Sequence, residues 1–184
     1  MANLILNGST SGSITISSPS VSGSNTLTLP ANTGTVLTTA STFGGTGPAF
    51  SAYNTSSQSV SNNTFTKVTL QTEVFDTNNN FASSRFTPTV AGYYQINGLL
   101  RVTGTAITGA IAVLYKNGSV YTYGQAFDGL SPVSAQIGVF EVIYMDGSTD
   151  YVELYGYITA TSPAFGHAAN HINCRFSGAM VRSA

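Results

Sequence analysis

His167 and His171, followed by Cys174, are the side chains whose types and spacing most resemble a metal site. Two histidines four residues apart lie side by side on a helix, and the residues between them do not look helical. On a strand they would share a face but stand well apart, because a strand rises about 3.3 Å per residue. Zinc needs three or four ligands on one centre. We therefore expect ordinary loop or strand residues here and no metal site within one chain.

The acidic residues give no stronger sign of chemistry. Residues 76–80 resemble the start of a calcium loop, but Phe81 and Thr87 stand where such a loop has glycine and glutamate. An Asn-rich turn is the better interpretation. Glycosidase chemistry would need two carboxyl groups across a cleft. The candidates are Asp128, Glu141, Asp146, Asp150 and Glu153. The aspartates among them lie mostly in Gly-rich turns, where aspartate is a common turn former.

No nucleophile elbow or phosphate-cradling loop is present in the sequence. The sequence therefore predicts a protein that is not an enzyme and holds no cofactor. A polysaccharide depolymerase is the weaker alternative.

Tyr151, Tyr155 and Tyr157 form a row that could bind another molecule. They alternate with aliphatic residues between positions 151 and 158, which places the aliphatic side chains in the core and the tyrosines outside. Aromatic patches commonly mark protein interfaces. We favour burial of these tyrosines between subunits, with a sugar-stacking face as the alternative.

The elements that position these residues are short runs of alternating apolar and polar residues, separated by Gly, Asn, Ser and Pro. This pattern predicts an all-β protein. Charged residues make up 7% of the chain and the net charge is -1. A chain with this net charge lacks the strongly basic surface that nucleic-acid-binding proteins present. No apolar stretch approaches the ~20 residues of a membrane span, and residues 1–7 do not resemble a signal peptide. We expect synthesis in a cytoplasm, no nucleic-acid partner and no membrane insertion.

Composition divides the chain into three parts. Residues 1–42 contain alternating runs at 13–17, 26–29 and 35–38 that carry too little apolar area for a core. A lone hairpin is marginal in water, so this predicted β-rich stalk or attachment segment needs identical neighbouring chains. Residues 43–48 are a predicted Gly-rich hinge. Residues 49–184 are the predicted head.

Regularly spaced strands are predicted in the head. Val68, Leu70 and Val74 should share one face of residues 66–75, and alternate residues from Tyr94 to Val102 should do the same. A hairpin turn is predicted at 116–119. Further strands are predicted at 111–116, 120–123, 136–144, 151–158 and 175–181, a pattern that suits a jelly-roll sandwich.

The head resembles the globular domain of complement C1q, within the jelly-roll superfamily that includes tumour necrosis factor. The similarity rests on seven pieces in order, from Ala49-Phe50-Ser51-Ala52, through Arg85-Phe86-Thr87-Pro88 and Gly92-Tyr93-Tyr94, to Phe176-Ser177-Gly178-Ala179-Met180-Val181. The resemblance implies a ten-stranded jelly roll and a homotrimer. It implies no particular ligand. A metal ion on the trimer axis, held by one His from each chain, is the alternative to a metal-free protein.

The segment before the head is similar to one common in bacteriophage tail-fibre and virion proteins. The similarity lies in Gly12-Ser13-Ile14-Thr15-Ile16, in Gly23-Ser24-Asn25-Thr26-Leu27-Thr28-Leu29-Pro30 and in residues 33–37. It implies a virion protein of the tail or capsid surface that attaches to other virion proteins through its N-terminal segment.

These resemblances predict a tail-fibre or tail-tip protein that contacts a host surface glycan or protein. A purely structural capsid decoration or collar protein is the alternative. Recognition is expected in head loops far from the hinge, because loops on a rigid scaffold carry function. The candidates are Asn79, Phe127, Asp128 and Phe165, although each phenylalanine could instead pack under its own loop.

Overall fold

The structure is a computed structural model that describes residues 4–7, 9–16, 23–24, 47–131, 134–166 and 174–184. The chain divides into two units, Met1–Ser41 and Thr42–Ala184. Every regular element of the described residues is a strand, which confirms the predicted all-β class. No membrane-spanning helix is found among the residues that the structure describes.

The first unit contains a single described hairpin. Strand β1 (Leu4–Asn7) pairs antiparallel with β2 (Ser13–Ile16), and Gly12 supplies a positive φ of 77° in the turn. The strand predicted at 13–17 is therefore confirmed as far as Ile16. The runs predicted at 26–29 and 35–38 lie outside the described residues, as does most of the predicted hinge.

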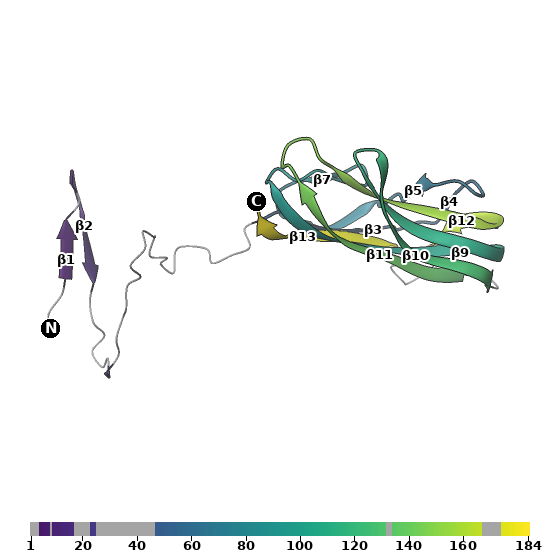
Figure 1. The fold of residues 1–184 in the computed structure, drawn as a ribbon, viewed down its shortest axis with the longest axis horizontal. Helices are drawn as coiled ribbons and strands as arrows, with labels where there is room; N and C mark the ends of the chain where they lie inside the picture. Colours follow the sequence, from purple (N-terminus) through teal and green to yellow (C-terminus); the bar gives the residue numbers. More distant parts are fainter. Residues whose placement is uncertain (1–3, 8, 17–22, 25–46, 132–133, 167–173) are drawn as a thin grey trace. The chain divides into compact units, whose positions relative to one another are not determined.

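The head is built around one long strand, β9 (Gly92–Lys116), which pairs in both layers (Figure 1). Its first half lies between β11 (Ser134–Met145) and β13 (Arg175–Ser183). Beyond β13 come β3 (Ala49–Tyr53) and then β6 (Thr72–Asp76). We call these five strand segments the first sheet.

The second half of β9 lies between β10 (Ser119–Ser131) and β12 (Val152–Phe165). Strand β12 also pairs with three two-residue strands, and a fourth completes the edge: β4 (Gln58–Ser59), β5 (Thr66–Lys67), β8 (Arg85–Phe86) and, beside β8, β7 (Phe81–Ala82). This is the second sheet. Because β9 joins both, the head is one continuous 11-stranded sheet folded into a sandwich.

Strand β9 folds back on itself between the two sheets. Lys116 Nζ donates to the carbonyl oxygen of Tyr144 at 2.8 Å, and Tyr144 stands opposite Tyr93 in the register. The two ends of β9 therefore lie at the same end of the head, with the bend near Ala106, whose φ is +51°. The sequence predicted two separate strands here, at 93–102 and 111–116.

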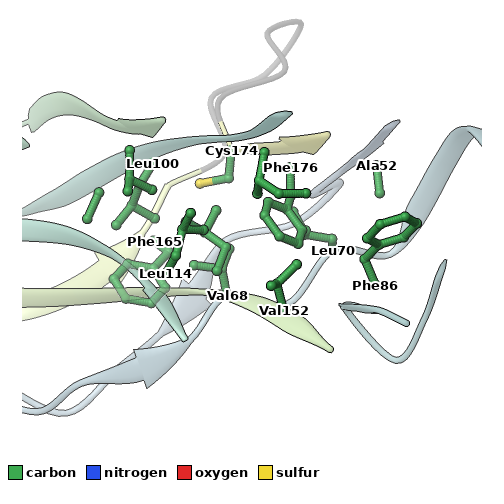
Figure 2. Close-up of a cluster of buried hydrophobic side chains, with 14 of the residues drawn as sticks. Ala52, Val68, Leu70, Phe86, Leu100, Leu114, Val152, Phe165, Cys174 and Phe176 are labelled. Atoms are coloured by element: carbon green, nitrogen blue, oxygen red, sulfur yellow. The ribbon is translucent and has the colours of Figure 1, made fainter. Parts of the chain in front are cut away.

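The core between the sheets follows the predicted alternation of β9. Tyr94, Ile96, Leu100 and Val102 are all buried. Phe50 contacts Phe81, Phe86 and Phe176 at centroid distances of 4.3 to 5.0 Å. Figure 2 shows Phe86 and Phe176 in this cluster with Leu100, Leu114, Val152 and Phe165, which come from both sheets. The core thus lies entirely within the second unit.

The turn predicted at 116–119 is confirmed. Asn117 and Gly118 both have positive φ, 53° and 80°, and Lys116 stands opposite Ser119. These are the dihedral signs of a type I′ hairpin, whose twist matches that of the flanking strands.

Val74 does not share a face with Val68 and Leu70, so that prediction is wrong. Val68 and Leu70 are buried, whereas Val74 is 54% exposed. Residues 68–71 separate β5 from β6, and the register between β3 and β6 jumps from Ser51–Phe75 to Ala52–Glu73. A β-bulge at Val74 breaks the two-residue period on which the prediction depended.

Candidate functional site

A polar pocket of about 490 Å³ lies beside strands β5, β7 and β8. We call it the basic pocket because two cations lie in its wall among uncharged, mostly polar residues: Lys67, Arg85, Asn79, Asn80, Ala82, Ser83, Thr87 and Thr89. Asn79, a predicted recognition residue, is part of this wall. Lys67 and Arg85 were not predicted as site residues.

A buried carboxylate fixes both cations. Glu153 on β12 is 2% exposed, and its Oε1 accepts from Lys67 Nζ at 3.1 Å and from Arg85 Nε at 2.8 Å. Lys67 Nζ also donates to the carbonyl oxygen of Ser83 at 3.1 Å. The Arg85 guanidinium lies 3.8 Å from the ring centroid of Tyr151, a cation–π contact. Two positive charges thus face one negative charge.

The backbone around the basic pocket is strained at three residues. Asn79, Ser83 and Ser84 have φ of 55°, 51° and 58°, in the left-handed region that non-glycine residues seldom adopt. Side-chain contacts hold Ser84 there, because its Oγ accepts from the backbone N–H of Leu70 at 2.8 Å. Ser83 and Ser84 form the tight turn between β7 and β8.

The Asn-rich turn at 76–80 is organised by its own side chains. Asp76 Oδ2 accepts from the backbone N–H of Phe81 at 2.7 Å, and the amide group of Asn80 contacts Thr89. Thr77 donates from its backbone N–H to the carbonyl oxygen of Ala49 at 3.0 Å. The turn therefore lies at the end of the head where β3 begins.

The predicted loop residues are not brought together. Asp128 is exposed and stands opposite Gly109 in β10, close to the bend of β9, whereas Asn79 lies at the opposite end of the head. Phe127 is partly buried and packs against the core. Residues 124–129 belong to strand β10 and are not a loop.

Phe165 is not a recognition residue, so that prediction is wrong. Its side chain is 0% exposed and belongs to the core cluster (Figure 2). Strand β12 continues to Phe165, which stands opposite Val102, so the predicted loop at 162–166 is mostly strand. The alternative for this residue was packing under its own loop; the structure buries it in the core, as part of a strand.

The tyrosine row packs partly against its own chain. Tyr155 stacks on Tyr115 with centroids 3.8 Å apart, and Tyr157 lies 5.1 Å from Phe65. The segment carrying Phe65 is held down by Asn63, whose Oδ1 accepts from the Tyr157 hydroxyl. Burial raises the pKa of Tyr155 and of Tyr115. Tyr151, Tyr155 and Tyr157 are each half-buried within one chain, and their place in a subunit interface stays a prediction.

A second apolar surface, on the first sheet, is left uncovered within one chain. We call it the assembly face: Tyr93 on β9, Phe140, Val142 and Tyr144 on β11, and Val181 on β13. Each is at least 43% exposed, and Phe140 reaches 60%. The ring centroids of Tyr93 and Tyr144 are 5.5 Å apart. A hollow of about 570 Å³ is lined by Tyr93, Val142, Val181 and the three residues that follow Val181. No pattern in the sequence predicted this face.

Within the described residues, no three His, Cys, Asp or Glu side chains gather as metal ligands. His167 and His171 lie outside the described residues. The Cys174 thiol is buried and contacts the carbonyl oxygens of Arg101 and Gly166, and burial raises its pKa to about 11. At neutral pH this thiol is protonated, which makes it a poor nucleophile.

Comparisons with known proteins support the fold of the head. No family model matches the chain, and no curated protein matches it. The globular domain of the zebrafish complement 1qA protein is 15% identical, with a TM-score of 0.52, and the match covers 74% of this chain and 99% of that chain. Murine APRIL at pH 8.0 is 8% identical, with a TM-score of 0.53, covering 73% and 98%. The predicted jelly roll of the C1q and tumour-necrosis-factor type is confirmed.

Proposed function

We propose that this chain is a bacteriophage virion protein, a tail-fibre or tail-tip component that assembles as a homotrimer and contacts the host surface through its head. It performs no catalysis: no described carboxylate lines the basic pocket, and Glu153, buried beneath its two cations, is engaged by both of them. Glycoside hydrolysis would need two carboxyl groups across the pocket.

The assembly face is the observation that carries the proposal. Monomeric proteins seldom expose a contiguous apolar patch of large side chains, and such patches mark interaction sites. Burying one large apolar side chain contributes about 1.5–3 kcal/mol. Charged residues are 7% of the chain, so solubility as a free monomer has little electrostatic support. A closed ring of identical chains would cover this face on every copy.

The jelly-roll fold and the N-terminal segment supply the rest of the proposal. Described side chains of the β1–β2 hairpin, such as Ile5 and Leu6, are more than half exposed, which suits a segment that packs against other chains. The resemblance of this segment to phage tail-fibre proteins supports attachment to the virion through it.

Sedimentation equilibrium of the full chain tests the assembly. The expected mass is three times that of the 19.1 kDa chain. A monomer at micromolar concentration would overturn the trimer.

Labelling of virions tests the role. A gold-conjugated antibody against the head should mark the tail, and saturating purified trimer should block virus adsorption. Label over the whole capsid surface, together with unchanged adsorption, would replace this function with a capsid decoration role.

A further inference from the structure

We propose that the basic pocket binds the carboxylate of an acidic sugar. This inference rests on the proposed host-contact function and names the class of ligand and the residues that recognise it. Arg85 and Lys67 bind the carboxylate, and the uncharged polar side chains of the wall contact the sugar hydroxyl groups.

The net charge at the pocket surface favours a ligand that carries a single negative charge. The side chains of Lys67 and Arg85 are 35% and 42% exposed, and the one carboxylate that they share, on Glu153, is almost completely buried beneath them. One positive charge is therefore uncompensated at the pocket surface. A sugar carboxylate carries one negative charge, whereas a phosphate monoester at neutral pH carries up to two.

Arg85 is positioned before any ligand arrives. Its Nε is bonded to Glu153, and the face of its guanidinium lies over Tyr151. Neither of its Nη groups donates to any residue that the structure describes. Two parallel N–H groups of a fixed guanidinium match the two oxygens of a carboxylate. A side chain that is already fixed loses little entropy on binding.

The rest of the wall is suited to hydroxyl groups. Asn80 and Thr89 bond one another, but the side chains of Asn79, Ser83 and Thr87 make no hydrogen bond with any other described residue. Ala82 is the one apolar side chain in the wall. A pocket of about 490 Å³ falls in the ~300–1,000 Å³ range of small-molecule sites. Its lining favours a polar, hydroxyl-rich ligand.

Backbone strain supports a binding role for the same residues. Asn79 and Ser83 hold left-handed φ values without being glycine, and such residues concentrate at ligand sites. Both contribute to the pocket wall.

Isothermal titration of the full chain with trigalacturonic acid tests the proposal, with the trimethyl ester of the same sugar and inorganic phosphate as comparison ligands. Trigalacturonate should bind, and the ester should bind at least about tenfold more weakly because it lacks the charge. Arg85→Gln should weaken binding of trigalacturonate by about tenfold or more. Arg175→Gln, the same change at an exposed residue of β13 outside the pocket, should leave binding unchanged.

A second variant keeps the proposal testable if Arg85→Gln fails to fold. Asn79→Gly removes an amide from the wall and suits the positive φ of that residue, so it should stay folded and bind trigalacturonate several-fold more weakly. Equal binding of acid and ester, or normal binding by both variants, would refute the proposal. Tighter binding of phosphate than of trigalacturonate would also refute it, in favour of a phosphate site.

The outcome can be separated from that of the proposed function. If the chain binds no acidic sugar but still binds host cells and blocks adsorption, the assignment of the pocket fails and the host-contact function stands. If it binds trigalacturonate but does not bind host cells, the pocket stands and the host-contact function fails.

Discussion

At the scale of single residues, Glu153 sets the geometry of the basic pocket. It is buried, and it accepts from Lys67 and Arg85 with the same oxygen atom. Glu153→Gln removes the negative charge and weakens both contacts. Because both cations are partly exposed and can hydrate, we expect a loss of about 1–3 kcal/mol in the free energy of unfolding. Urea denaturation measures this loss.

The matched control is Glu73→Gln on β6, where the glutamate is exposed and makes no ion pair within the described residues. It should change the free energy of unfolding by less than about 0.5 kcal/mol. Equal effects of the two substitutions would mean that Glu153 does not hold the pocket together.

The turn at 146–150 should make the head sensitive to acid. Hydrogen bonds from the backbone N–H groups of Asp150 and Ser148 and from the Thr149 side chain hold the pKa of Asp146 well below its ordinary value of 3.8. Burial raises the pKa of Asp150, but hydrogen bonds from Lys116 and Asn117 outweigh it and leave the pKa lowered. A lowered pKa in the folded state adds stability that is present above the unfolded value and is lost as pH falls through the folded value.

The thermal midpoint should therefore fall as pH is lowered from about 5 to about 2. In Asp146→Asn the same decrease should be smaller, because one of the two carboxyl groups no longer titrates. Asp128→Asn, at an exposed residue of β10, should keep the wild-type slope. Parallel profiles for all three proteins would contradict the assignment.

At the scale of elements, two turn glycines differ in their surroundings although both have positive φ. A Cβ at Gly147 would lie 2.3 Å from the backbone nitrogen of Ala91, whereas a Cβ at Gly118 would meet only the Tyr151 hydroxyl at 3.4 Å. Gly118→Ala should cost about 1–2 kcal/mol of stability through backbone strain alone. Gly147→Ala adds an overlap with backbone atoms, so the total loss should exceed about 3 kcal/mol. Thermal unfolding of both variants checks the order; equal losses would show that the backbone yields at Gly147.

Local patterns in the sequence predicted several elements correctly. The alternation from Tyr94 to Val102 identified buried residues, because a paired strand has a period of two. The Asn117-Gly118 pair identified its turn, because both residues tolerate positive φ. Val74 was misplaced because a bulge changes the period without a local signal, and Phe165 because Gly and Pro near it suggested a loop where β12 in fact continues.

Little of the candidate site could be predicted, because it depends on contacts distant in sequence. Asn79 was found from its turn composition. Glu153 shares the outer face of β12 with the tyrosines, so alternation predicted exposure; it is buried because β5 and β8 bring Lys67 and Arg85 over it. The assembly face was missed because residues 136–144 are apolar on both faces, and no sequence pattern says which face stays uncovered.

At the scale of the whole molecule, one substitution distinguishes the two candidate interfaces. Phe140 is 60% exposed in a single chain, so Phe140→Asp should leave the head folded. In a trimer closed through the assembly face it would place a charge in each interface, and the particle should dissociate in sedimentation experiments. Tyr121→Asp, at an exposed residue of β10 on the second sheet, should remain trimeric.

A subunit interface at the tyrosine row, as predicted from the sequence, leads to the opposite expectation for dissociation. If Tyr155 lies between subunits, Tyr155→Glu should dissociate the trimer while Phe140→Asp does not. Because Tyr155 stacks on Tyr115 within one chain, the variant's circular dichroism must first show a folded head.

The two units should also differ when separated. The core lies within Thr42–Ala184, so a chain that begins at Phe43 should fold and trimerise. An isolated peptide of residues 1–42 should show little ordered structure, because a two-stranded hairpin cannot offset its ordering entropy. Circular dichroism of both fragments measures this. A folded, monomeric peptide would contradict the predicted dependence of this segment on its neighbours.

The pairing of β3 with β13 has a consequence for biosynthesis. The first strand of the head, Ala49–Tyr53, is hydrogen-bonded to Arg175–Ala179, more than a hundred residues later in the chain. While the ribosome is still making the intervening strands, β3 has no β13 to pair with on one side, and the bulged β6 is its other neighbour. Such high contact order delays folding and leaves apolar strands exposed in the nascent chain. The head therefore completes its fold only after β13 leaves the ribosome, and chaperone demand during expression should be highest just before that point.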